Sequence, residues 1–105
     1  PSANIRARVV AARERQRERF ANCPGVHCNA QMSARQLQEL VQLNKAAQDA
    51  LSMALDRLGL SARAYERVLK VARTIADLDG SDKVQRQHIA EAVSYRNLDR
   101  STWGT

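Results

Sequence analysis

The chain has 105 residues, enough for a single domain spanning residues 1–105 and too few for a second complete hydrophobic core. Hydrophobic residues make up 44% of it and only four residues are aromatic, which argues against wholesale disorder and favours closely packed helices over a β-sandwich. The net charge is +6, and because fourteen of the seventeen basic residues are arginine, the composition favours two-pronged contacts with phosphate or carboxylate groups.

Residues 4–20 are predicted to form an amphipathic helix that carries most of the excess charge. Six arginines against two glutamates give residues 1–20 a net charge of +4. Apolar side chains recur at helical spacing in one narrow stripe, made of Ile5, Val9, Ala12 and Phe20. Arginines line both edges of the stripe, with Arg6, Arg13 and Arg17 on one side and Arg8, Arg15 and Arg19 on the other. Whatever covers the stripe therefore meets guanidinium groups, unless the arginine stems lie along it with their heads in water.

The next segment, residues 21–32, is predicted to be a connection, because Pro24 and Gly25 interrupt the helical spacing. Ser33 begins a capping-box pattern that opens a short helix extending to about Val41. Asn44 is expected to cap a third helix, which ends at a glycine, Gly59. This helix is predicted to be buried over much of its circumference because its apolar residues are spread widely around it. They are Ala46, Ala47, Ala50, Leu51, Ala54, Leu55 and Leu58.

A fourth helix is predicted from a cap at Ser61 to about Leu78, with Gly80 stopping it. Its expected inward face consists of Tyr65, Val68, Leu69, Ala72, Ile75 and Ala76. After a turn, Val84 is expected to be an apolar anchor, and a fifth helix is predicted from about Arg86 to Tyr95. Residues 97–105 lack periodicity and are expected to form a frayed tail, in which Trp103 is the one candidate to dock. The predicted fold is all-α, a compact bundle of four to five helices.

Two cysteines and a histidine lie in the connection, but their spacing does not favour a metal site. Cys23, His27 and Cys28 lack the second close pair that structural zinc uses, with distant His88 as the one further ligand. A catalytic cysteine is not expected either, because neighbours in sequence are not arranged to activate a nucleophile. Two reduced packing thiols and a disulfide between Cys23 and Cys28 are the alternatives left open. Without a glycine-rich phosphate loop as well, the chain alone lacks the parts of a catalyst.

The sharpest feature is an arginine in the first turn of the fourth helix. If Ser61 is the cap, Arg63 is the second helical residue, where unpaired backbone N–H groups and the helix dipole favour an anion. A cation at this position is unfavourable by up to about 1 kcal/mol unless an anion approaches it. A phosphate contact is therefore one interpretation of Arg63, and a solvated arginine is the other.

Four ordered stretches of the chain together resemble a known family. They are residues 5–13 (IRARVVAAR), 28–31 (CNAQ), 60–78 (LSARAYERVLKVARTIADL) and 88–96 (HIAEAVSYR). Over residues 4–100, nearly the whole chain, they resemble the C-terminal helical lid domain of magnesium-chelatase-like AAA+ ATPases. The similar branch is the bacterial ComM/YifB type, which is associated with natural competence and DNA recombination.

The resemblance implies a role for Arg63 as the sensor-2 arginine, which reaches the phosphates of ATP held by a preceding α/β ATPase domain. Ser61 would be its helix cap, and Arg67, one turn further on, a weaker candidate for the same contact. ATP and Mg²⁺ would be bound by a longer protein, and this chain alone is expected to bind neither. The first residue is Pro1 and not Met, which agrees with the expectation that the chain is a piece of a longer protein. The implied partners are that ATPase domain, neighbouring subunits of a ring expected to be hexameric, and DNA through the longer protein.

Two functions of other classes also fit the composition. A stand-alone DNA-binding module would use the basic first helix, although no aromatic residues are interleaved there for base stacking. A helical homo-oligomerisation domain would need an exposed apolar face. No apolar run approaches the length of a membrane span and none follows a basic start, so we expect a cytoplasmic chain that does not contact membranes.

Overall fold

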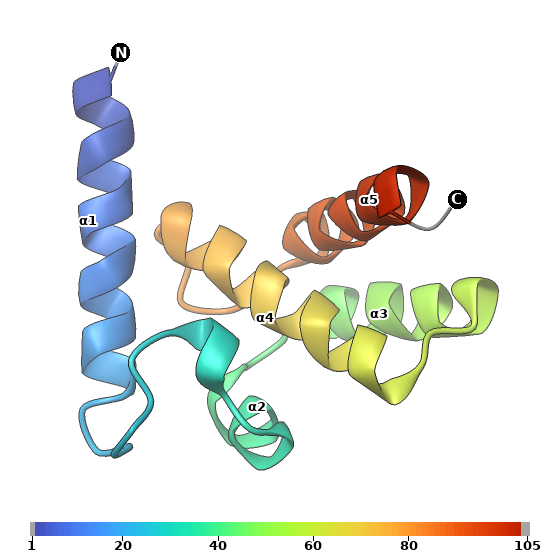
Figure 1. Ribbon diagram of the computed structural model, residues 1–105, viewed down its shortest axis with the longest axis horizontal. Helices are drawn as coiled ribbons and strands as arrows, with labels where there is room; N and C mark the ends of the chain where they lie inside the picture. The colour runs from blue at the N-terminus through green and yellow to red at the C-terminus, as the bar shows by residue number, and fades with distance from the viewer. Residues whose placement is uncertain (1, 104–105) are drawn as a thin grey trace.

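The computed structural model describes the backbone of residues 2–103 and the side chains of residues 3–95. Over this range it contains five α-helices and one short 3₁₀-helix, which are α1 (Ser2–Arg19), η1 (Asn29–Gln31), α2 (Ala34–Leu40), α3 (Lys45–Leu58), α4 (Ala62–Leu78) and α5 (Arg86–Trp103). Helix α4 crosses the middle of the molecule, with α1 beside one end and α3 and α5 beside the other (Figure 1). The predicted all-α bundle is confirmed.

Side-chain caps fix the start of α2 and α3 where the sequence predicted. The capping box of α2 is complete, because the Gln36 N–H donates to Ser33 Oγ (3.2 Å) and the Ser33 N–H donates to Gln36 Oε1 (2.9 Å). At α3, the Ala47 N–H donates to Asn44 Oδ1 at 2.8 Å. Each cap satisfies an N–H group that has no partner within the helix, an effect worth about 1 kcal/mol.

Glycines end α3 and α4, also as predicted. Gly59 has φ 58° and Gly80 has φ 72°, a left-handed conformation that other residues rarely adopt. Past the end of α4 the Gly80 N–H donates to the Asp77 carbonyl (3.1 Å) and the Ser81 N–H to the Ala76 carbonyl (2.9 Å). This pair of bonds is the Schellman motif, which turns the chain sharply toward α5.

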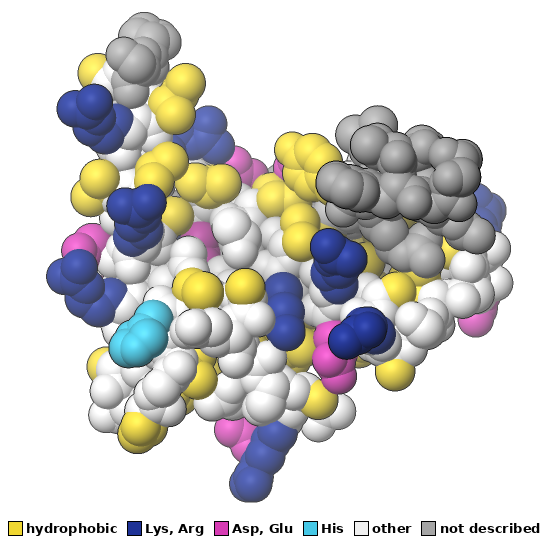
Figure 2. All heavy atoms as spheres, viewed as in Figure 1, with side chains coloured by type: hydrophobic (Ala, Val, Ile, Leu, Met, Phe, Trp, Pro, Cys, Tyr) yellow, Lys and Arg dark blue, Asp and Glu magenta, His cyan; other side chains and the backbone are white. Residues whose placement is uncertain are grey.

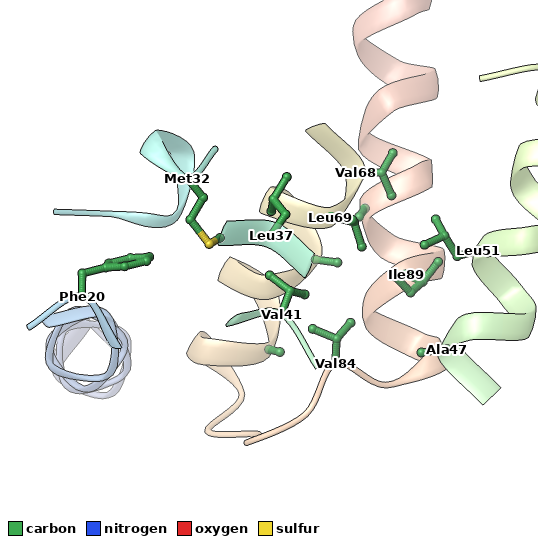
Figure 3. Packing of buried hydrophobic residues seen from close by; sticks show 13 residues of the cluster. Phe20, Met32, Leu37, Val41, Ala47, Leu51, Val68, Leu69, Val84 and Ile89 are labelled. Atoms are coloured by element: carbon green, nitrogen blue, oxygen red, sulfur yellow. The ribbon is translucent and has the colours of Figure 1, made fainter. Parts of the chain in front are cut away.

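The hydrophobic core lies where α5 packs between α3 and α4 and where α2 packs on α4, and it is closed by two loops that pair with each other. Val84, the predicted anchor, is fully buried and forms a parallel bridge with Leu43. Its N–H donates to the Gln42 carbonyl at 2.8 Å, and its own carbonyl accepts from the Asn44 N–H at 3.2 Å. Figure 3 shows Val84 pointing into a cluster that includes Leu69, Leu51 and Ile89.

The apolar stripe of α1 is covered over about half of its length. Ala12 and Phe20 are buried, whereas Ile5 is 62% exposed. The reason is geometric, because α1 continues past the end of α4 and its first turns have no helix beside them (Figure 1). Phe20 lies just beyond the helix and points toward Met32, another buried residue (Figure 3).

The expected broad burial of α3 is wrong. Ala47 and Leu51 are buried, but Ala50, Ala54, Leu55 and Leu58 are half-buried and Ala46 is exposed. Helix α3 lies at the edge of the bundle and packs mainly against α5, so one side of it faces outward (Figure 1). The sequence pattern records which residues are apolar, and the position of the helix decides which of them are covered.

The fifth helix is longer than predicted. It begins at Arg86 as expected but continues to Trp103, past the predicted end at Tyr95. No Gly or Pro occurs between residues 81 and 103 to stop it. The backbone is helical at residues 97–103, where the sequence predicted a frayed tail, and residues 104–105 lie outside the described residues. The side chain of Trp103 lies outside them as well, so its predicted docking stays a prediction. Among the helices in the described range, none is both long enough and apolar enough to cross a membrane.

Candidate functional site

The start of α4 has the geometry that the sequence predicted. The Ala64 N–H donates to Ser61 Oγ at 3.2 Å, so Ser61 is the N-cap and Arg63 is the second helical residue. The Arg63 side chain is exposed. Among the side chains that the structure describes, none forms a hydrogen bond or ion pair with Arg63. Its guanidinium is therefore available to an anion approaching from outside the domain.

Two further cations continue from Arg63 along one face of α4. At about 100° per residue, Arg63, Arg67 and Lys70 fall within about 60° of the helix circumference and span about 10 Å of its length. Arg67 is exposed and Lys70 is half-buried. Half-buried Glu66 borders the same face and supplies one opposing charge. The three cations can bind an anion, but neither they nor Glu66 provide a nucleophile with an adjacent base, so this face offers no means of covalent catalysis.

The face of α4 that carries Arg63, Arg67 and Lys70 becomes covered further along the helix, where α1 and η1 pack on the same side. Thr74, one turn beyond Lys70, accepts a hydrogen bond from Asn29 Nδ2 at 3.0 Å, and Asn29 is fully buried. Asp77 follows after another turn and is covered by Arg19. One side of α4 is therefore open at its first two turns and covered by the rest of the domain at its last two.

The covered part of α4 contains a buried charge network centred on Asp77. Arg19 donates to both carboxylate oxygens of Asp77 (2.6 and 2.9 Å), and Asn29 Nδ2 donates to one of them (2.9 Å). Arg73 Nε donates to Asp77 Oδ1 at 3.2 Å. Arg73 is itself buried, and its remaining donors reach the Ser81 and Asp82 carbonyls at 2.6 and 2.9 Å. The network ties α1, η1, α4 and the loop before α5 to one carboxylate.

The network also determines the ionisation of its members. Burial alone would raise the pKa of Asp77, but hydrogen bonds from Arg19 and Asn29 and the charge of Arg73 outweigh it, so this pKa lies below its usual value. Burial lowers the pKa of Arg73, and the nearby Asp77 carboxylate opposes that shift. Asp77 is accordingly an anion in the folded protein at neutral pH, and it offsets one of the two guanidinium charges beside it.

The arginines on one edge of the α1 stripe bind the carboxyl end of α4. Arg8 donates to the Leu78 carbonyl and to Asp79, both at 3.2 Å. Arg15 donates to the Gly80 carbonyl (3.0 Å) and pairs with Asp82 (3.1 Å). Cations are favourable at this end of a helix because its last carbonyl groups carry partial negative charge. With Arg19, these residues make up the predicted Arg8, Arg15 and Arg19 edge.

The other edge of the stripe has no partner in α4. Arg17 pairs with Glu14 of its own helix at 3.2 Å, and both side chains are exposed. Arg6 and Arg13 are exposed as well. The predicted division of the arginines into two edges therefore corresponds to two environments. One edge lies at the contact between α1 and α4, and the other lies outside that contact.

The cysteine and histidine side chains are not brought together as metal ligands. His88 Nδ1 accepts from the Gln85 N–H at 2.9 Å and His88 Nε2 lies 2.9 Å from Asp79 Oδ2, so both ring nitrogens are used. Cys23 and Cys28 are half-buried thiols, and no disulfide joins them in the described part of the chain. In the same part of the chain, no cluster of three or more histidine, cysteine or acidic side chains has a metal-binding arrangement. His27 is exposed.

Sequence reasoning missed Asp77 and Asn29, which organise the polar interior. A signal was present for the first, because Arg73 and Asp77 are spaced four apart at the edge of the apolar face of α4, where an ion pair can form along the helix. No comparable signal exists for Asn29, whose importance depends on contacts with residues 45 and 48 positions away.

Comparison with known proteins agrees with the resemblance seen in the sequence. The family model described as magnesium chelatase, subunit ChlI C-terminal, matches residues 1–96. The chain is 46% identical over 99 residues to YifB of Escherichia coli and to YifB of Salmonella typhimurium, both uncharacterised proteins, with 94% of this chain and 19% of each relative covered. It is 41% identical over 99 residues to the competence protein ComM of Haemophilus influenzae, with 94% of this chain and 18% of ComM covered. No solved structure matches the chain.

This chain spans about a fifth of the length of these relatives, whereas the family model covers nearly all of it. The matched region includes α1 to α4 with the Ser61 cap, Arg63 and the Asp77 network. The resemblance predicted from the sequence is confirmed at the level of the family. The chain belongs to the magnesium chelatase ChlI C-terminal domain family, in the form found in YifB and ComM.

Proposed function

We propose that this chain is the helical lid of an AAA+ ATPase and that Arg63 is the sensor-2 arginine that contacts the phosphates of ATP. Ser61 caps the first turn of α4, and the exposed Arg63 guanidinium therefore lies at the N-terminus of the helix, the end that favours an anion. Arg67 assists from the next turn. The nucleotide and its Mg²⁺ are held by an α/β ATPase domain that precedes the lid, and the isolated chain hydrolyses no ATP.

The observation that carries the proposal is the combination of exposure and position at Arg63. A cation in a first helical turn is unfavourable unless an anion is near. Glu66 borders the same face, but among the described side chains none forms an ion pair with Arg63. A nucleotide phosphate would supply it, and a planar guanidinium can bind two phosphate oxygens at once. The buried Asp77 network holds the opposite end of α4, so the helix carrying Arg63 moves with the domain as one body.

The proposal extends to the assembly by way of the relatives. One of them is named a competence protein, and we propose by analogy that the longer protein forms a ring, expected to be hexameric, in the cytoplasm. In such a ring, ATP binding and hydrolysis would move the lid against the ATPase domain, and this motion would be used on DNA during recombination.

A stand-alone DNA-binding function for α1 receives less support. Three of its six arginines, Arg8, Arg15 and Arg19, are already paired with aspartates of the same domain. The other three share the outward faces of α1 with Glu14 and Glu18, which leaves a net charge of +1 there. So small an excess provides little of the counterion release that drives binding to a DNA backbone.

The test is steady-state ATP turnover by the longer protein carrying Arg63→Ala. Arg86→Ala is a matched control, because Arg86 is also an exposed arginine in the first turn of a helix. We expect Arg63→Ala to lower turnover by about tenfold or more with an unchanged melting temperature, and Arg86→Ala to leave turnover unchanged. Wild-type turnover in the Arg63→Ala protein would overturn the assignment.

A further inference from the structure

One face of α1 is built like a protein interface and has no partner among the residues whose side chains the structure describes. It consists of Ile5, Arg6, Val9, Val10, Arg13 and Arg17, which fall within about 140° of the helix circumference. We call this set the outer face of α1. Ile5 is 62% and Val10 52% exposed, and they are two of the four large hydrophobic residues that stand out as exposed among the described side chains.

The first turns of α1 gain little from the rest of the domain. Residues 3–8 are all exposed, Val9 is half-buried, and Ala12 is the first buried residue of the helix. Before Ala12, the polar contacts that reach another element are those of Arg8 with Leu78 and Asp79. Short helices without tertiary packing are marginally stable in water, so a covering partner would stabilise this stretch.

The outer face leads into a hollow at the other end of α1. An open cavity of about 770 Å³ is lined there by Arg13, Gln16, Arg17, Phe20 and the loop of residues 21–28. In the space-filling view, hydrophobic and basic side chains alternate along α1 on the visible side (Figure 2). Apolar side chains interleaved with arginine are typical of protein interfaces, where arginine is enriched and lysine is depleted.

Charge and composition discriminate between possible occupants. A second copy of the chain would bring Arg6, Arg13 and Arg17 against the same three arginines. A nucleic-acid backbone would leave Ile5 and Val10 against phosphates, with no apolar contact. An apolar protein surface with carboxylates at its rim satisfies both the aliphatic side chains and the guanidinium groups.

We propose that the outer face of α1 docks on an acid-rimmed apolar surface of the ATPase domain, an inference that rests on the proposed function. Under that function the ATPase domain joins the chain ahead of Pro1, beside the exposed end of α1, and the relatives have about four fifths of their length outside the matched region. Helix α1 then has two interfaces. Its Arg8, Arg15 and Arg19 edge holds α4, and its outer face holds the ATPase domain.

The experiment uses the longer protein with a protease site inserted directly before Pro1. After cleavage, we expect the lid to co-elute with the ATPase domain in size-exclusion chromatography. Val10→Asp is expected to weaken this association about tenfold or more. Met53→Asp is the matched control, because Met53 on α3 is 53% exposed, nearly the same as Val10, and lies outside the outer face. It should leave the association unchanged.

Three results would overturn the inference. The first is separation of the wild-type lid after cleavage, and the second is equal weakening by Val10→Asp and Met53→Asp. The third is that the 105-residue chain binds a labelled DNA duplex, and that Arg13→Glu abolishes this binding while Val10→Asp leaves it intact. Such a result would assign the outer face of α1 to nucleic acid. The Arg63→Ala turnover assay can fail while docking persists, so failure of the nucleotide contact and failure of the docking surface are distinguishable.

Discussion

Replacing Asp77 with asparagine removes one charge from the domain interior and keeps the size of the side chain. In the wild-type protein the carboxylate lies against Arg19 and Arg73, and Arg73 has 2% of its side chain exposed. Asp77→Asn leaves the Arg73 charge buried without a counterion, a change that costs about 3 to 5 kcal/mol. A domain of this size has a total stability of about 5 to 15 kcal/mol, so the expected loss is a large part of it.

The assay is urea and thermal unfolding of the 105-residue chain, followed by far-UV circular dichroism. The expected fall in melting temperature is at least about 12 °C, since 1 kcal/mol corresponds to about 4 to 8 °C in small domains. Asp82→Asn is the control, because Asp82 pairs with Arg15 but has 94% of its side chain exposed. It should cost less than about 1 kcal/mol. Equal stabilities for the two variants would refute the claim that burial makes the Asp77 network strong.

The remaining predictions concern pH and the charge at the start of α4. Because the pKa of Asp77 is lowered by folding, its contribution is complete above its unfolded pKa of about 4 and is lost as the pH falls through the lower folded value. Wild-type stability should therefore drop below about pH 4 more steeply than that of Asp77→Asn, and parallel pH profiles of melting temperature would contradict this assignment. At neutral pH, Arg63→Gln should raise the unfolding free energy of the isolated chain by about 0.3 to 1 kcal/mol, because it removes a cation from a helix N-terminus. A loss of stability in urea titrations would mean that Arg63 makes a stabilising contact within the domain.

The features that the sequence predicted well depend on neighbouring residues. Ser33, Asn44 and Ser61 cap helices through contacts with residues three positions away. Gly59 and Gly80 end helices because of their own backbone freedom. The place of Arg63 in the first turn of α4 follows from the same local signal, the Ser61 cap.

The features that the sequence did not predict depend on distant contacts. Asp77 looks like a solvated residue near the end of a helix until Arg19, 58 residues away, is placed against it. The half-covered stripe of α1 follows from its projection beyond α4, and the exposed side of α3 from its place at the edge of the bundle. Periodicity identifies the residues that are able to be buried, whereas the arrangement of helices decides how many of them are.

Helix α4 is held at its carboxyl end and open at its amino end, and this asymmetry separates two kinds of evolutionary constraint. Substitutions around residue 63 can alter the affinity for an external anion while the interior stays intact. Changes at residues 73 and 77 endanger the fold before they alter any interaction with a ligand. Variation among relatives should therefore be tolerated differently along a single helix, with functional tuning concentrated in its first turns and near invariance in its last.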